Sequence, residues 1–477
     1  MAKNRINMKK IVFISLFFTM GCKVPSLVQV ENKQLIPVVF NQSKDSVNAA
    51  DIQWRSFFAD ANLVALIDTA LKNNYELLST VQNIEIAKNN IRIKHADLLP
   101  KVSSLVGLGL EKTARYTASG AGNASTEITP GKEVPEPIAD IFLGFRASWE
   151  ADIWGKLHNA KKSAFIKYLK TMEGRKFLIT NLIAEVANSY YELLALDNQL
   201  DIIQQAIDLQ KSELEVVKIQ KEAAKVTELA VKQFEAQVYN SESQLYDVKQ
   251  SIVETENKIN FLLGRFPQPI LRDKKVFSST ITKNTQLGLP TQLLENRPDI
   301  KQAELELQAA RLDVKIARAE FYPSVGFNST LGLQAFKPKY LVSGIEGLAF
   351  SLVGDMVTPL INKNSIIAEF NNANANQISA LYDYQKMVLT GYVEVSNQVS
   401  NLENLEKYYT TKNKESETLT QSIDIAKDLF KSARANYLEI LMVQRDALLA
   451  KLELVEAKKK QFITVTNIYK ALGGGWK

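Results

Sequence analysis

The sequence is poor in the residues that metal sites and catalytic centres most often use. Its 477 residues include one cysteine, Cys22, and two histidines, His95 and His158. A single cysteine excludes a disulfide bond within the chain, and so few cysteines and histidines exclude the common zinc sites. The sequence also lacks a recognisable pairing of a nucleophile with a base. We therefore expect no catalytic residues, no metal ion and no cofactor, and we expect that the protein is not an enzyme.

Helix-breaking residues and long apolar runs are scarce as well. The chain has 20 glycines and 13 prolines, and residues 138–266 and 360–472 contain no proline. Long stretches without such breakers predict very long helices. Beyond Cys22, no segment reaches the roughly 18 consecutive apolar residues of a membrane-spanning helix, so we expect none.

No strong excess of one charge is present. The formal net charge is +6, and four of the positive residues, Lys3, Arg5, Lys9 and Lys10, precede Cys22, which leaves the rest of the chain near +2 (6 − 4 = 2). There is no basic stripe with interleaved aromatic residues. We therefore expect no nucleic-acid partner.

The N-terminus has the organisation of an export signal. The basic residues are followed by Ile11–Met20, an apolar run too short to span a bilayer, and then by Gly21 and Cys22. The arrangement resembles a bacterial lipoprotein signal over residues 1–21, in which Cys22 is lipidated. Thr19 departs from that pattern, because leucine is usual at this position. An ordinary secretory signal with a free cysteine nearby is the alternative.

Four segments of about ten residues alternate apolar with small or polar residues: Lys101–Glu111, Ile141–Glu150, Ser324–Leu333 and Gly347–Met356. Their length and period fit strands that cross an outer membrane. A half-buried sheet in a soluble domain has the same period. The export signal and the turn-rich loops between the strands favour the membrane barrel. Arg146 and Asn328 are candidates for its lumen, although Arg146 could pair with Glu150 instead.

Two long segments predict coiled-coil helices. Apolar residues recur at every seventh position in the first of them, at Val186, Leu193, Leu200, Ile207 and Leu214. A helix from Lys156 to about Lys221 would be about 100 Å long at roughly 1.5 Å per residue. Such a length exceeds that of a compact domain.

The chain also contains two copies of one unit. Glu185–Asn188 matches Glu394–Asn397, and Asn260–Gly264 matches Tyr469–Gly473, both at an offset of 209 (394 − 185 = 209; 473 − 264 = 209). Each copy predicts a helix, a β-hairpin and a pair of long helices. The expected organisation is a signal at 1–21, an extended lipid-anchored segment at 22–60, a first repeat at 61–265 with its hairpin at 101–151, a linker at 266–289, a second repeat at 290–472 with its hairpin at 323–359, and a tail at 473–477.

Four strands are too few for a membrane barrel, which starts at about eight. Open sheet edges are not tolerated in lipid, because their backbone groups have no partners. Several subunits must therefore contribute strands in a cyclic assembly. Two subunits give 8 strands with a filled interior, and three give 12 strands with room for a lumen.

Three strings carry a family resemblance: Trp149–Lys156, Arg297–Ile300 followed by Tyr322–Ser324, and Ala471–Trp476. In this order, and across nearly the whole chain from Trp54, they resemble the TolC-like outer-membrane efflux proteins. The resemblance implies a mixed α/β membrane protein that forms a homotrimer. Four strands per subunit would close a 12-stranded β-barrel, which would continue into an antiparallel coiled-coil α-barrel through the periplasm.

The resemblance also implies a function and partners. The protein would be the passive exit duct of a tripartite efflux system for drugs, metals or other small molecules. Its partners would be a periplasmic adaptor, an inner-membrane transporter and outer-membrane lipid held through Cys22. The alternatives are a duct for type I polypeptide secretion and a periplasmic coiled-coil scaffold without a pore.

Repeat alignment places the turns of the two long helix pairs near residues 223–227 and 432–436. By resemblance these tips contact the adaptor, and the candidates are Ala224, Lys225, Val226, Ala433, Arg434 and Ala435. The family usually has glycine where Ala224 and Ala433 stand.

Acidic residues precede the second of these turns. By resemblance, Asp424 and Asp428 face the axis of the periplasmic aperture, with Gln421 as a further candidate. A ring of such carboxylates would attract cations. A solvated helix face is the alternative, in which Lys427 and Lys431 pair with the two aspartates at i, i+3.

Overall fold

The computed structural model describes residues 48–278, 287–358, 363–432 and 434–477, together with Ser26, Pro37 and Phe40 and without the side chains of Thr129 and Lys363. The predictions for residues 1–21, for Cys22 and for Ala433 lie outside the described residues. The chain divides into two compact units. Within the described ranges, the sheet unit consists of residues 85–169 and 305–381, and the helix unit of the remainder.

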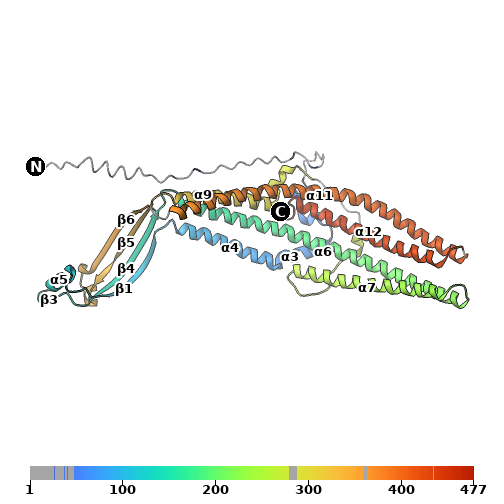
Figure 1. Cartoon of the computed structure of the whole chain (residues 1–477), viewed down its shortest axis with the longest axis horizontal. Coiled ribbons are helices and arrows are strands. Elements are labelled where there is room, and N and C mark those ends of the chain that lie inside the picture. The colour runs from blue at the N-terminus through green and yellow to red at the C-terminus, as the bar shows by residue number, and fades with distance from the viewer. Residues whose placement is uncertain are drawn as a thin grey trace. The chain divides into compact units, whose positions relative to one another are not determined.

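The elements follow one another in a mixed helical and strand order (Figure 1). In the first half of the chain they are η1 (Ala49–Asp51), α2 (Trp54–Phe57), α3 (Ala61–Asn73), α4 (Tyr75–Ala96), β1 (Lys101–Glu111), α5 (Ala118–Ser125), β2 (Glu127–Thr129), β3 (Lys132–Glu133), β4 (Ile138–Ala151), α6 (Lys156–Glu222) and α7 (Glu228–Leu262). In the second half they are η2 (Lys274–Ser278), η3 (Pro290–Gln292), α8 (Leu293–Asn296), α9 (Pro298–Ala319), β5 (Ser324–Ala335), α10 (Pro338–Leu341), η4 (Ile345–Gly347), β6 (Leu348–Val357), α11 (Lys363–Lys431) and α12 (Tyr437–Ala471).

The four predicted strands form one antiparallel sheet in the order β1-β4-β5-β6. Strand β4 starts at Ile138, three residues before its predicted start at Ile141 (141 − 138 = 3). The central pairing joins the two halves of the chain, with Arg146 opposite Thr330 and Ser148 opposite Asn328. Strands β1 and β6 are the two edges, and neither pairs with a further strand among the described residues.

The helices agree closely with the breaker-free segments. Helix α6 has 67 residues and ends at Glu222, one residue beyond the predicted end, and α11 has 69. The two returning helices, α7 and α12, have 35 residues each. Among the described residues, no helix combines the length and the apolarity that a membrane span requires.

Four of the five predicted heptad positions are buried in the helix unit, and Leu200 is half-buried. Val186 and Leu193 are fully buried, and Ile207 and Leu214 are 2% and 8% exposed. The first of them belong to a core that also includes Tyr190, Ile259 and Leu263. The sevenfold spacing of apolar residues therefore marks the buried stripe of α6, as coiled-coil packing requires.

Equivalent residues of the two halves make equivalent contacts near the ends of the long helix pairs. The Asn74 side chain donates to the carbonyl of Leu262 at 3.0 Å, and the Arg297 guanidinium donates to the carbonyl of Ala471 at 3.0 Å. Leu262 and Ala471 are separated by the offset of the sequence match (471 − 262 = 209), and Asn74 and Arg297 are 223 residues apart (297 − 74 = 223). Arg297 is longer than Asn74, and it reaches Glu394 on α11 as well, at 2.7 Å.

Arg297 remains charged although its side chain is only 7% exposed. Burial opposes its charge, but hydrogen bonds and ion pairs with Asp299 and Glu394 outweigh burial and raise the pKa of Arg297. Glu394 of α11 thus helps to neutralise a buried arginine. Its repeat partner Glu185 lies 3.6 Å from Lys258.

Candidate functional site

Paired residues of antiparallel strands point to the same side of a sheet, and successive residues point to opposite sides. In the four-stranded sheet, this alternation places apolar residues on one face and mostly polar or small residues on the other. The apolar face is uncovered: Leu108 is 80% exposed, Phe350 78% and Leu352 75%. A soluble domain rarely exposes an apolar surface of this extent. The face carries Val102, Val106, Leu108 and Leu110 of β1, Leu143, Phe145 and Trp149 of β4, Phe327 and Leu331 of β5, and Leu348, Phe350, Leu352 and Met356 of β6.

The polar face carries mostly small and hydrophilic residues, with Leu105, Phe142 and Val353 among them. The register places Arg146 and Asn328 on this face, in neighbouring rows of β4 and β5. Both side chains are exposed. Glu150, on the same face, binds Lys156 of α6 at 2.6 Å. The alternative pairing of Arg146 with Glu150 is therefore not found in this structure.

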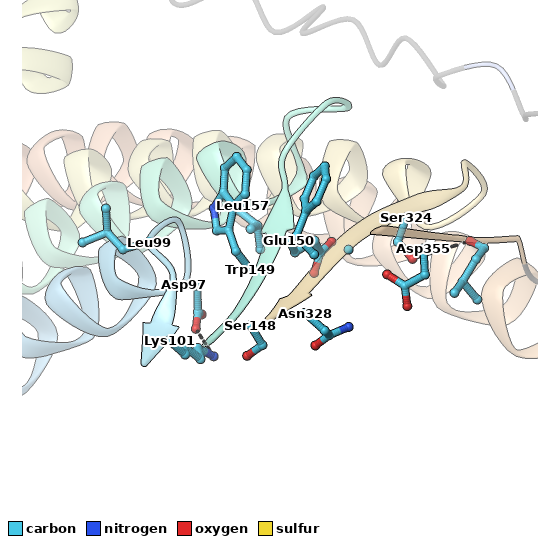
Figure 2. A pocket seen from close by; sticks show the side chains of 13 residues that line it. Asp97, Leu99, Lys101, Ser148, Trp149, Glu150, Leu157, Ser324, Asn328 and Asp355 are labelled. Atoms are coloured by element: carbon cyan, nitrogen blue, oxygen red, sulfur yellow. Dashed lines mark hydrogen bonds and ion pairs between the residues drawn. The ribbon is translucent and has the colours of Figure 1, made fainter. Parts of the chain in front are cut away.

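A hollow of about 450 Å³ lies at the end of the sheet that leads into the helices (Figure 2). The Trp149 indole donates to the carbonyl of Leu98 at 3.0 Å and stacks on Phe327 with 5.8 Å between ring centres. Ser148 and Asn328 project from the opposite side of the strands in Figure 2, where Asp97 binds Lys101 at 3.1 Å. These contacts fix the junction between strands and helices.

Asp152 determines where α6 begins. Its carboxylate accepts hydrogen bonds from the backbone N–H groups of Leu157 and His158 at 2.9 and 2.8 Å, and from the His158 ring at 2.5 Å. Burial alone would raise the pKa of Asp152, but these hydrogen bonds outweigh burial and lower it. The side chain thus satisfies N–H groups that the first turn leaves unpaired.

The turn between α6 and α7 has the left-handed residue that usually ends a helix. Ala224 has a φ of +55° and is the only residue other than glycine with a positive φ in the described parts of the chain. The Lys225 N–H donates to the carbonyl of Gln220 at 2.9 Å. Ala224 and Lys225 are exposed, and Val226 packs against the apolar cluster around Leu214 and Phe234.

The second turn closes with the same bond, from the Arg434 N–H to the carbonyl of Leu429 at 2.8 Å. Arg434 is exposed and Ala435 is half-buried. Among the described residues of the two tips, Ala224, Lys225 and Arg434 are thus the exposed predicted contacts.

The three aperture candidates, Gln421, Asp424 and Asp428, are all exposed on α11. Lys431 lies 3.8 Å from Asp428, and both side chains are at least 75% exposed. Lys427, the predicted alternative partner of Asp424, binds Glu213 of α6 at 2.8 Å instead.

The contact between Lys427 and Glu213 is part of a polar link between helices that no sequence pattern predicts. Glu213 also accepts a hydrogen bond from Gln444 of α12, so one carboxylate connects α6, α11 and α12. A second such cluster joins Arg272 to Asp197 at 2.6 Å and to Glu256 of α7. Its partners are far apart in the sequence, and no local spacing relates them.

These contacts hold the strands, the helix ends and the turns in place. Among the residues that the structure describes, no group of three or more His, Cys, Asp or Glu side chains could hold a metal ion. In the hollow, Asp97 is paired with Lys101 and Glu150 with Lys156.

The profile of the outer membrane efflux protein family matches residues 66–265 and 289–474, which is most of the chain. The chain belongs to the outer membrane efflux protein family. The predicted family and the predicted role in efflux at the outer membrane are thereby confirmed. The family is one of efflux proteins and not of enzymes.

Relatives of this outer membrane efflux protein match along most of their length. The pyoverdine export outer membrane protein OpmQ of Pseudomonas aeruginosa is 28% identical over 432 residues, which are 90% of this chain and 89% of OpmQ. The probable outer membrane lipoprotein SilC of Salmonella typhimurium is 22% identical over 475 residues, 98% of this chain and 99% of SilC.

The fold is that of a solved channel. The crystal structure of the open state of the Neisseria gonorrhoeae MtrE outer membrane channel matches with a TM-score of 0.81 and 22% identity, and it covers 95% of this chain and 98% of MtrE. The mixed helical and strand fold class is thereby confirmed for this outer membrane efflux protein.

Proposed function

We propose that three copies of this outer membrane efflux protein close a 12-stranded barrel, which is the passive exit duct of a tripartite efflux system. The observation that carries the proposal is the sheet with an exposed apolar face and with two edges that pair with no further strand of the described chain. In lipid, every backbone N–H and C=O group needs a partner, so β1 of one copy must pair with β6 of the next. The apolar face then contacts lipid and the polar face lines a lumen.

The number of copies follows from the width of the barrel. Two copies would give 8 strands, whose interior is filled by side chains, whereas three give 12 and leave an open passage. The polar face suits a passage, because its central rows contain Ser103, Gly144, Thr330 and Gly332. Arg146 and Asn328 would then line the lumen.

The long helix pairs would form the coiled-coil wall of the duct from two copies of one ancestral unit. Their matched lengths and the matched contacts of Asn74 and Arg297 support the duplication. The duplication corresponds to the proposed repeats at 61–265 and 290–472. Neighbouring subunits would cover the faces that one chain leaves exposed.

The proposed partners are a periplasmic adaptor and an inner-membrane transporter. The adaptor would contact the two turns through Ala224, Lys225, Val226, Ala433, Arg434 and Ala435. The aperture would lie beside them, with Asp424, Asp428 and Gln421 facing the axis. Cys22 would carry the lipid that anchors the chain, a proposal that the name of SilC, an outer membrane lipoprotein, supports.

The cargo class that we propose is small molecules. The name of OpmQ, a pyoverdine export protein, supports such a cargo over a secreted polypeptide. Deletion of the gene is then expected to raise the sensitivity of the cell to small toxic compounds and to leave polypeptide secretion unchanged. The opposite pattern would favour the type I duct.

Cysteine cross-linking tests the barrel directly. A chain with Val106→Cys on β1 is combined with a second cysteine on β6, at Ser351, Leu352 or Val353 in turn. Because β1 and β6 are opposite edges of one sheet, we expect disulfide-linked trimers in outer membranes for at least one pair. The matched control combines Val106→Cys with Leu331→Cys on β5, which β4 and β6 separate from any edge contact.

The same preparations are examined in planar lipid bilayers. The proposed duct gives stable single-channel conductance and trimers that dissociate only on heating. A monomer without cross-links and without conductance would leave the coiled-coil scaffold as the better interpretation.

A further inference from the structure

The middle of the polar face carries one charge that no other group of the described chain neutralises. Arg146 lies in register with Ser103 of β1 and Thr330 of β5, and Thr330 in turn is opposite Ser351 of β6. The Thr330 and Ser351 hydroxyls lie 2.7 Å apart. One arginine and three hydroxyl residues thus form a row across all four strands, which we call the Arg146 row.

The guanidinium is free and accessible. Arg146 is exposed, and among the described residues no hydrogen bond or ion pair holds its side chain. The next row towards the loops contains Leu105, Gly144, Gly332 and Ala349. No long polar side chain of that row can cover the arginine.

The acidic residues of the same face are paired or distant. Glu150 and Asp140 lie four and six residues from Arg146 along β4 (150 − 146 = 4; 146 − 140 = 6). At roughly 3.3 Å per residue these separations are about 13 and 20 Å, beyond the Debye length of about 8 Å at physiological ionic strength. Glu150 is bound to Lys156, and Asp355 lies in the row of Glu150.

The nearest other charge on the face has the same sign as Arg146. Lys101 is opposite Ser148, one row from Arg146, and its ammonium binds Asp97 at 3.1 Å. The central part of the polar face is therefore cationic, between acidic rows at its two ends.

We infer that three Arg146 side chains form a cationic level in the lumen, which contacts the carboxylate, phosphate or sulfonate groups of anionic cargo. The inference rests on the proposed function, because one chain supplies only one guanidinium. A planar guanidinium presents five N–H donors that match the oxygens of such groups. A barrel of 12 strands spaced about 4.8 Å apart and tilted about 40° has a backbone diameter on the order of 24 Å. Cargo that contacts the wall at this level lies within one Debye length, about 8 Å, of an arginine, closer than either acidic row.

Reversal potentials in a potassium chloride gradient test the inference with trimers in planar bilayers. We expect Arg146→Gln to lower the ratio of chloride to potassium permeability at least about twofold, because fixed charge in a low-dielectric passage controls local ion concentration. Arg146→Glu is expected to lower the ratio further, and Arg146→Lys to keep it near the parental value. The matched control is Arg115→Gln, which removes the same charge from a loop outside the polar face, where Arg115 lies 3.9 Å from Glu133.

The outcomes separate the inference from the proposal beneath it. If all variants conduct as trimers and the permeability ratio of Arg146→Glu equals that of the parent, the inference of a cationic level is wrong. The proposal of a trimeric duct is unaffected by that result. An equal decrease for Arg115→Gln and Arg146→Gln would also overturn it. If the parental protein forms neither trimers nor channels, the proposed duct itself fails.

Discussion

At Ala224 the backbone takes a left-handed conformation that glycine adopts more easily. The Cβ atom of an L-residue is strained at a φ of +55°. The turn nevertheless keeps the usual helix-ending bond from Lys225 to Gln220. A single alanine thus leaves the geometry of the tip intact and lowers its stability.

Ala224→Gly is therefore expected to stabilise the protein by about 0.5–1 kcal/mol. Relief of the strain is worth about 1–2 kcal/mol, and the greater freedom of glycine in the unfolded chain removes about half of that. Thermal unfolding of the purified protein measures the change. Ala223→Gly, one residue earlier, has no strain to relieve and is expected to destabilise.

Asp152 makes stability depend on pH at the start of α6. Its pKa is lowered in the folded protein, so its contribution is present above the unfolded value of about 3.9 and is lost as the pH falls through the folded value. We expect Asp152→Asn to reduce stability by about 1 kcal/mol at pH 7, the usual value of a helix N-cap. The difference from the parent should shrink below about pH 4.

Unfolding curves at pH 7 and pH 3 check this prediction. Asp247→Asn, an exposed position in the middle of α7, is the control and should change little at either pH. A difference between Asp152→Asn and the parent that is the same at both pH values would contradict the expectation.

Among the elements, the two long helix pairs are joined close to their turns by a polar link. Glu213 of α6 binds Lys427 of α11 and Gln444 of α12, and its side chain is only 17% exposed. A largely buried carboxylate with two partners couples elements more strongly than an exposed ion pair does. The apolar cluster of Val217, Phe234 and Ile440 packs beside it.

Glu213→Ala is expected to cost about 1–3 kcal/mol of stability, because it leaves two partners without their acceptor. A double-mutant cycle with Lys427→Met should give a coupling energy of about 1 kcal/mol or more. Lys431→Met removes the exposed pair with Asp428 and should change stability by less than about 0.5 kcal/mol. Equal effects of the two lysine substitutions would argue against a special link at Glu213.

At the scale of the whole molecule, a symmetric assembly would repeat each residue once in every subunit, so that one residue would form a ring around the axis. Asp424 and Asp428 are exposed in the single chain, so they are available to an axis or to solvent. Three copies around an axis would concentrate their charges at one level, as they would those of Arg146 at another. The two proposed levels would have opposite signs, and the ion selectivity of the proposed duct would report on both.

The double variant Asp424→Asn with Asp428→Asn is therefore expected to lower the ratio of potassium to chloride permeability at least about twofold, because a ring of carboxylates attracts cations. Single-channel recordings in planar bilayers measure this ratio. Glu439→Gln, in the first turn of α12, removes one negative charge from an exposed position and serves as the control. If the ratio is unchanged in the double variant, the two aspartates belong to a solvated helix face.

The sequence by itself determined the element order, the strand alternation and the length of the long helices. Each of these depends on local chemistry: the absence of proline, the sevenfold spacing from Val186 to Leu214, and the two-residue period of strands such as Ser324–Ala335. Local periodicity needs no knowledge of distant partners, because backbone geometry fixes it.

Only the tertiary structure decided which polar residues meet. In the structure Glu150 binds Lys156, so Arg146 is left without an ion pair among the described residues. Lys427 binds Glu213. The structure also shows that Ala224 adopts the conformation expected of glycine. The sequence offers each long charged side chain many possible partners of opposite charge. Only the packing of separate elements brings one of these partners within contact distance.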